Sequence, residues 1–412
     1  MKRKDINNYI SVKFVLISFL LVLFSVSSCN DEEFLDEEPR DFYSPENAYV
    51  TSTDFQAAVA DIRAFIRDDF FTSYHGDHLI AFSWSLSDLS YPTRGHFDRK
   101  PNMANYLTPM SHTVASIAWE PGYRVIYDAN VILAQLESGD HELSESEKKK
   151  VEAQARFFRG YIYKILGNLY GGVPLVLKPV EGPARDYTRS SREETYNQAI
   201  SDLEFARDNL PGINEIPDVS YICDLAAKHY LAELYITVGR YGDAITEATE
   251  VINDDVHLMR ERFGNQIEPP RWEGNVYWDM FRRGNVARSN GNMETIWAVP
   301  FAYNTPGGGN GGPGVRQSPR LWQAKVQNND GSYVPLTPWP NDKHYGRGAG
   351  AARPSHYFLQ TLWKKSGWDG DITTPNQDIR NARCNIRRDW KVMNPSSDHN
   401  GKWVKKDNLP IK

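Results

Sequence analysis

Cysteine is scarce in this chain, whose 412 residues contain three cysteines. Cys29 lies near the N-terminus, so only Cys223 and Cys384 remain in the body of the protein. Two cysteines so far apart provide neither a disulfide framework nor a Cys-x-x-Cys pair. Cys223 lies in a helical pattern and is predicted to be a small core residue. A Cys223–Cys384 disulfide stays open, because it requires the two residues to be close in space.

Long apolar runs are also missing. The run Phe14–Phe24 has eleven residues, whereas a membrane-spanning helix needs about 20. Basic residues precede this run and small residues follow it, so residues 1–28 are predicted to be an export signal. The small residues before Cys29 resemble the lipobox of bacterial lipoproteins, in which the cysteine carries lipid; an ordinary secretory peptide is the alternative. Residues 29–44 are acidic, which favours a solvated tether.

The chain lacks the motifs of common enzyme and metal sites. It has no Gly-x-Ser-x-Gly elbow, and its Gly-rich segment 305–314 lacks the Gly-Lys-Ser/Thr ending of a nucleotide loop. Residues 75–78 (His-Gly-Asp-His) lack the glutamate of a helical zinc motif, and residues 369–371 (Asp-Gly-Asp) lack EF-hand spacing. We predict polar loops there, with no catalytic residue, no metal and no cofactor.

Positive charge is not in excess. Without residues 1–28 the chain has 43 Lys and Arg against 52 Asp and Glu, a net charge of −9. This balance argues against nucleic acid as the main ligand. The apolar content of 40% is sufficient for a core, and the length fits one large domain or two to three of average size.

Residues 45–260 have the periodicity of paired helices. Helices are predicted over residues 53–69, 114–135, 226–239 and 240–252, and after serine–glutamate capping boxes at Ser144 and Ser191. The junction near Gly239, read as Gly-x-Tyr-x-x-Ala-Ile, resembles that of a tetratricopeptide repeat (TPR). The predicted fold class is mostly α, a TPR-like helical scaffold followed by a loop-rich, irregular second half.

The segment 153–176 is the most distinctive, with the sequence AQARFFRGYIYKILGNLYGGVPLV. Its apolar residues recur at three- and four-residue steps and share one face, and Arg159 is predicted among the polar side chains between them. Gly171 and Gly172 end the helix. Periodicity alone does not require the Arg-Phe-Phe-Arg-Gly run or the Tyr-Gly-Gly-Val-Pro-Leu ending. Both resemble the SusD/RagB family of surface nutrient-binding lipoproteins.

Residues 261–412 have a different composition. Pro, Gly, Asn and Trp dominate, and nine of the eleven tryptophans lie between Trp272 and Trp403. We predict long loops and short strands, including a strand over residues 293–300, with Trp297 in the core. Family members usually continue well beyond this point, so the resemblance indicates an incomplete C-terminal region and a helical repeat without its terminal cap.

The resemblance implies a surface glycan-binding lipoprotein that is lipid-anchored at Cys29 in the outer membrane and faces outward. It would deliver oligosaccharides to a SusC-like TonB-dependent transporter without catalysis. Sugar rings stack on aromatic faces, and their hydroxyls need amides, carboxylates or Arg nearby. Family sites draw on the loop after the first helix and on loops of the irregular half. The corresponding ligand-binding candidates are Trp84, Asp88, Tyr91, Arg94, Trp272, Tyr277, Trp278, Trp322 and Trp339.

Trp272 and Trp278 are the strongest of these candidates, because neighbouring Gly and Asn predict an irregular turn. Two alternatives stay open. The first is a TPR-like protein-assembly module with no role in sugar binding. The second is a nutrient lipoprotein of the same family that binds peptides. The sequence does not name the glycan.

Overall fold

The computed structural model describes residues 48–72, 89–92, 118–180, 182–268, 273–301, 308, 325–335, 352–355, 357–362, 379–381 and 389–405. The chain divides into two compact units, Met1–Tyr49 and Val50–Lys412. All elements named below belong to the second unit. The predicted signal, the tether and Cys29 lie outside the described residues.

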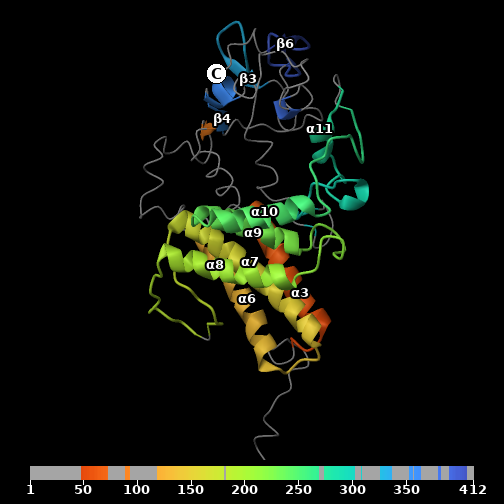
Figure 1. Ribbon diagram of the computed structural model, residues 1–412. Helices are drawn as coiled ribbons and strands as arrows, with labels where there is room; N and C mark the ends of the chain where they lie inside the picture. The colour runs from red at the N-terminus through yellow and green to blue at the C-terminus, as the bar shows by residue number, and fades with distance from the viewer. Residues whose placement is uncertain are drawn as a thin grey trace, which may run out of the picture. The chain divides into compact units, whose positions relative to one another are not determined.

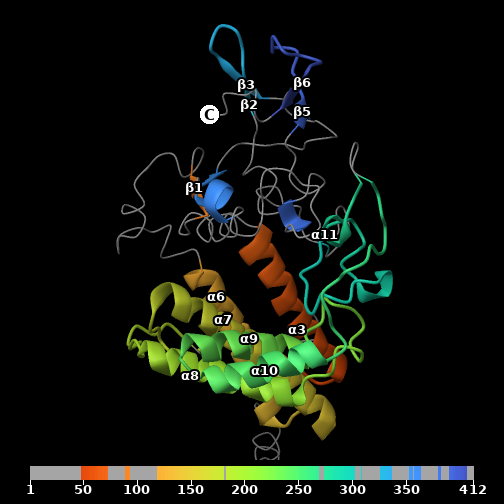
Figure 2. The ribbon, with the colours of Figure 1, turned by 45° about the horizontal axis from the view of Figure 1, so that its top comes forward.

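Successive helices form the scaffold of this unit (Figure 1). They are α3 (Ser52–Phe65) with the π-helical turn η1 (Ile66–Thr72), α6 (Trp119–Ser138), α7 (Glu145–Tyr170), α8 (Arg192–Asn209), α9 (Asp224–Thr237) and α10 (Tyr241–Asn253). From α6 onward each helix packs on the next, α3 packs on α6, and α9 and α10 run side by side (Figure 2). The mostly α, TPR-like scaffold is therefore confirmed. Within the described part of the chain, each helix is too short or too polar to cross a bilayer.

The second half is irregular, as the sequence predicts. It contains α11 (Val276–Met280), the short helical turns η3 (Arg288–Asn290), η4 (Tyr357–Leu362) and η5 (Ile379–Asn381), and short strands. Three antiparallel pairs are formed by β1 (Ser90–Pro92) with β4 (Ala352–Pro354), β2 (Lys325–Gln327) with β3 (Tyr333–Pro335), and β5 (Asp389–Lys391) with β6 (Trp403–Lys405).

The predicted strand over residues 293–300 is wrong. This segment makes isolated backbone hydrogen bonds instead of a ladder. The amide of His257 donates to the Met293 carbonyl at 3.0 Å, and the amide of Ala298 donates to the Val219 carbonyl at 2.7 Å. A strand needs a partner along its whole length, and these isolated bonds do not supply one.

Arg159 on α7, which the sequence pattern groups with the polar side chains between the apolar ones, is buried. Its Nε and Nη2 donate to the two carboxylate oxygens of Asp202 on α8, at 2.8 and 2.7 Å. Its Nη1 donates to Asn130 Oδ1 on α6 at 2.8 Å. One side chain therefore joins three helices. Such bidentate pairing is the geometry in which Arg binds carboxylate most strongly.

Glycines let α7 approach its neighbours. A Cβ atom at Gly160 would lie 2.9 Å from the carbonyl oxygen of Ala199 on α8, and one at Gly167 would lie 2.7 Å from the ring of Tyr196. Both contacts are closer than side-chain carbons normally reach, so only glycine fits without a shift. The close packing of α7 on α8 thus depends on these two positions.

The two glycines after α7 have different roles. Gly171 has φ of 76° and ψ of −131°, a conformation that favours glycine. Gly172 has no room for a side chain, because a Cβ would lie 1.9 Å from the Ser190 carbonyl oxygen. The following segment is held back on α7, where the Val176 amide donates to the Tyr163 hydroxyl at 2.8 Å.

Cys223 is the N-cap of α9 and is buried, so its predicted core position is confirmed. Burial raises the pKa of its thiol to about 11, which makes the thiolate rare at neutral pH. Cys384, its possible disulfide partner, lies outside the described residues.

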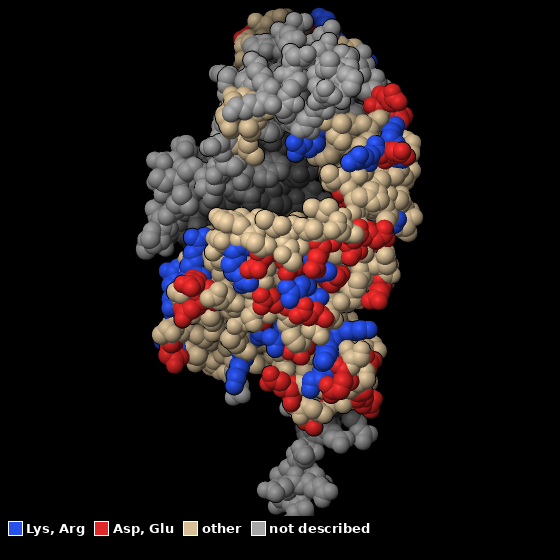
Figure 3. Space-filling view, viewed as in Figure 1, with Lys and Arg blue, Asp and Glu red and all other residues tan. Residues whose placement is uncertain are grey.

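The outer face of α10 carries apolar side chains. Tyr241, Ile245 and Ile252 are 63%, 67% and 73% exposed, at steps that place them on one face. Figure 3 shows a strip free of Lys, Arg, Asp and Glu where Figure 1 places this helix. Below it, Lys and Arg side chains are interspersed with Asp and Glu side chains on this face.

Capping boxes should make the stability of the helices pH-dependent. Hydrogen bonds from Ser144 to Glu147, and from Ser191 to Glu194, hold the pKa of each glutamate below its usual range. A lowered folded-state pKa stabilises the protein above the unfolded pKa of about 4.3, and this contribution is lost as the pH falls through the folded-state value. Glu147→Gln and Glu194→Gln should therefore destabilise the protein at pH 7 and make little difference near pH 3, as measured by thermal melts.

Glu193→Gln is the control, because it removes a charge from the same turn as Glu194 and leaves the capping box intact. An equal pH-dependent loss of stability in this variant would contradict the prediction.

Candidate functional site

The structure describes three of the nine predicted ligand-binding residues. Tyr91 lies in β1, opposite Arg353 in β4. Tyr277 and Trp278 lie on α11. The other six are outside the described residues: Trp84, Asp88, Arg94, Trp272, Trp322 and Trp339.

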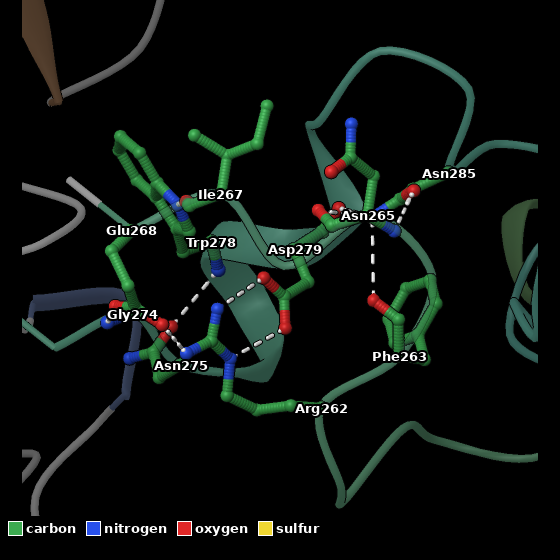
Figure 4. Close-up of polar contacts among 10 residues, drawn as sticks. All are labelled: Arg262, Phe263, Asn265, Ile267, Glu268, Gly274, Asn275, Trp278, Asp279 and Asn285. Carbon is green, nitrogen blue, oxygen red and sulfur yellow. Dashed lines mark hydrogen bonds and ion pairs between the residues drawn. The ribbon is translucent and has the colours of Figure 1, made fainter.

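Trp278 sits on a rigid turn (Figure 4). Asn275 caps the turn by accepting a hydrogen bond from the Trp278 amide at 2.9 Å, and the indole Nε1 donates to the Ile267 carbonyl at 2.8 Å. The guanidinium of Arg282 lies 3.7 Å from the centre of the indole ring. One ring face is therefore occupied by a cation, and a sugar would have to stack on the other.

An ion pair between the half-buried Arg262 and the fully buried Asp279 fixes this turn. Arg262 donates through Nε and Nη2 to both carboxylate oxygens of Asp279, at 2.7 and 2.8 Å (Figure 4). Arg262 also pairs with Glu268, and this hydrogen bond holds the pKa of Glu268 below its usual range. This network is not predictable from the sequence, because nothing in the sequence pairs Arg262 with a residue of the next helix.

A pocket of about 410 Å³ lies elsewhere, against α3. Its volume falls within the roughly 300–1,000 Å³ of small-molecule sites. Three segments supply its wall: residues 60–67 of α3 and η1, residues 218–221 before α9, and residues 297–300. The Ala298–Val219 backbone hydrogen bond ties two of these segments together.

Two aromatic rings and an arginine supply the pocket with groups that could bind a ligand. The guanidinium carbon of Arg63 lies 4.1 Å from the centre of the Tyr221 ring. Trp297 also lines the pocket and is half-buried. Its indole makes edge contacts with Phe157 and Tyr161 on α7, with ring centres 5.6 Å apart in each case. These contacts hold the indole against the core.

The sequence analysis assigned Trp297 to the core and did not consider Arg63 or Tyr221. The core contact of Trp297 is confirmed, but the same side chain also borders the pocket. Arg63 lies on an amphipathic helix, where a polar residue carries no special signal. No pattern in the sequence brings positions 63, 221 and 297 together, so only the fold reveals this site.

In the described ranges, no group of three or more His, Cys, Asp or Glu side chains is placed to hold a metal ion. Residues 75–78 and 369–371, which the sequence analysis interpreted as polar loops, lie outside these ranges.

A family model described as "Starch-binding associating with outer membrane", of SusD-like type, matches residues 33–236. SusD-like protein P25 of Formosa agariphila is 26% identical over 302 residues, which cover 71% of this chain and 52% of that protein. SusD-like protein P2 of the same organism is 27% identical over 259 residues, which cover 61% of this chain and 48% of that protein. The chain thus spans about half the length of the curated relatives it matches.

Solved structures agree on the fold. A SusD homolog from Bacteroides thetaiotaomicron has a TM-score of 0.55 at 16% identity, and the match covers 78% of this chain and 57% of that one. The matched region 33–236 contains the buried α7 motif and its Gly-Gly ending. Over residues 33–236 the chain therefore matches the SusD-like family.

Proposed function

We propose that this protein is a surface glycan-binding lipoprotein that captures oligosaccharides and passes them to a SusC-like TonB-dependent transporter without catalysis. The observation that carries the proposal is the match to a family described as starch-binding and associated with the outer membrane. The pocket bordered by Arg63, Tyr221 and Trp297 supports it with a suitable binding surface.

The pocket combines the two kinds of contact that sugars need. Arg63 covers one face of the Tyr221 ring, so the other face and the indole of Trp297 would contact the C–H groups of a pyranose ring. The N–H groups of Arg63 would donate to ring hydroxyls. The walls come from a helix and from loops that are anchored to α7. Such preorganised walls lower the entropic cost of binding. The nine residues predicted from the resemblance remain part of the proposal as a wider contact surface.

Location and delivery complete the proposal. Cys29 would carry the lipid that anchors the protein in the outer membrane, facing outward, and the acidic residues 29–44 would act as a tether. Capture at the surface raises the local concentration of the oligosaccharide at the mouth of the transporter.

Binding should depend on the pocket. Arg63→Ala and Tyr221→Ala should each weaken oligosaccharide binding about tenfold, because each removes a contact worth roughly 1–1.5 kcal/mol. Titration calorimetry of the purified protein against oligosaccharides that shift its melting temperature measures this loss. Arg240→Ala is the matched control. Its guanidinium carbon lies 4.2 Å from the Tyr235 ring, a similar stack that is not part of the pocket wall.

Two outcomes would contradict this proposal. If peptides and not oligosaccharides raise the melting temperature, the peptide-binding alternative is correct. If the pocket variants bind normally while Ile245→Ser on the exposed face of α10 abolishes capture of a partner protein, the assembly alternative is correct. The apolar strip on α10 is the observation that favours this second alternative.

A further inference from the structure

The charged groups of the pocket are unevenly paired. Arg67 donates from Nε to the neighbouring Asp68 at 3.0 Å, and Asp218 accepts a hydrogen bond from the Ser220 amide at 2.7 Å. Arg63 differs, since within the described part of the chain it stacks on Tyr221 and forms no ion pair. Among the described residues, no carboxylate therefore forms an ion pair with this guanidinium of the pocket.

Stacking on Tyr221 leaves the N–H donors of Arg63 available to bind an anion. A guanidinium that lies over an aromatic ring uses its face, while its five N–H donors remain in its own plane. Because the group stays charged at every relevant pH, its N–H donors match carboxylate and sulfate oxygens in a bidentate arrangement. The protein's overall charge is negative, so attraction of an anion must come from this local group.

We propose that Arg63 binds an anionic group of the glycan, the carboxylate of a uronate or a sulfate ester, while Tyr221 and Trp297 contact the sugar ring. The inference rests on the proposed glycan-binding function and narrows the substrate to acidic oligosaccharides. Asp218 also lines the pocket, and its carboxylate would repel an anion.

The test uses two pairs of matched probes. The first pair is short oligogalacturonides and the same oligomers after reduction of their carboxylates to alcohols. The second is sulfated galactan oligosaccharides and the same oligosaccharides after desulfation. Titration of the full-length protein should show that one charged probe binds about 10- to 100-fold more tightly than its neutral counterpart. This preference should shrink as ionic strength rises. The pair that shows it distinguishes carboxylate from sulfate.

Charge variants sharpen the result. Arg63→Gln should remove the preference, Arg63→Lys should keep part of it, and Asp218→Asn should strengthen binding of the charged probe, because it removes repulsion and keeps an acceptor for the Ser220 amide. Arg240→Gln is the control, and unchanged melting temperatures verify that the variants fold. Equal binding of charged and neutral probes would overturn this inference and leave the proposed function standing. Failure of every oligosaccharide, charged or neutral, to bind would overturn both.

Discussion

Replacing Arg159 by methionine should lower the free energy of unfolding by about 3 kcal/mol or more, the lower end of the range for breaking a buried ion pair. The change leaves Asp202, which is fully buried, without its bidentate partner and leaves Asn130 without its donor. Arg156, whose Nη1 lies 3.7 Å from Asp202, offsets part of the loss. Denaturant unfolding of the purified protein measures the effect.

A double replacement separates the ion pair from the packing. Arg159→Met with Asp202→Leu removes both charges and should recover much of the stability, because an apolar pair of similar volume has no buried charge to desolvate. Arg124→Ala is the control, since its pair with Asp128 is on the surface and is worth about 1 kcal/mol or less. Equal losses for Arg159→Met and Arg124→Ala would show that the buried pair has no special role.

Gly172→Ala should destabilise the protein by about 3 kcal/mol, the upper end for overpacking. The new Cβ would meet backbone on the opposite side, 1.9 Å from the Ser190 carbonyl oxygen and 2.7 Å from the Ser191 carbonyl carbon. That backbone is not free to move, because the Ser190 amide donates to the Val173 carbonyl at 3.2 Å and the Arg189 guanidinium donates to the Gly172 carbonyl. The measurement is again denaturant unfolding.

Gly182→Ala provides the control for this prediction. A Cβ at Gly182 meets no described atom within 4 Å, so the change should fall within about 0.5 kcal/mol of the wild type. A Gly172→Ala protein as stable as the Gly182→Ala protein would mean that the turn relaxes, and that the Gly-Gly ending is not a steric requirement.

The sequence predicted the features of this fold that depend on local chemistry. The starts of α7 and α8 follow from capping boxes. In each box the serine side chain accepts a hydrogen bond from the glutamate backbone N–H, and the glutamate side chain accepts one from the serine backbone N–H. Both boxes form in the structure. Arg159 shows the limit of such reasoning. Periodicity placed it with the surface residues, and its burial depends on Asp202, 43 positions further along the chain.

The candidate site was less predictable, because it also depends on contacts between residues that are far apart in the sequence. Resemblance pointed to loop aromatics, and of these the structure describes the surroundings of Trp278 well enough to show one occupied face. The pocket unites a helix residue, a residue before α9 and a tryptophan that was assigned to the core. Its geometry depends on long-range packing, which neither periodicity nor short motifs encode.

Some residues that line the pocket lie inside the range matched by the family model, and others lie outside it. Arg63 and Tyr221 lie within residues 33–236, whereas Trp297 and its neighbours lie beyond them. The residues of the wall before position 236 thus lie inside the family match, and the segment 297–300 lies outside it. Substitutions at positions 298–300 would alter this part of the wall and leave the buried arginine and the paired glycines of the helical scaffold untouched.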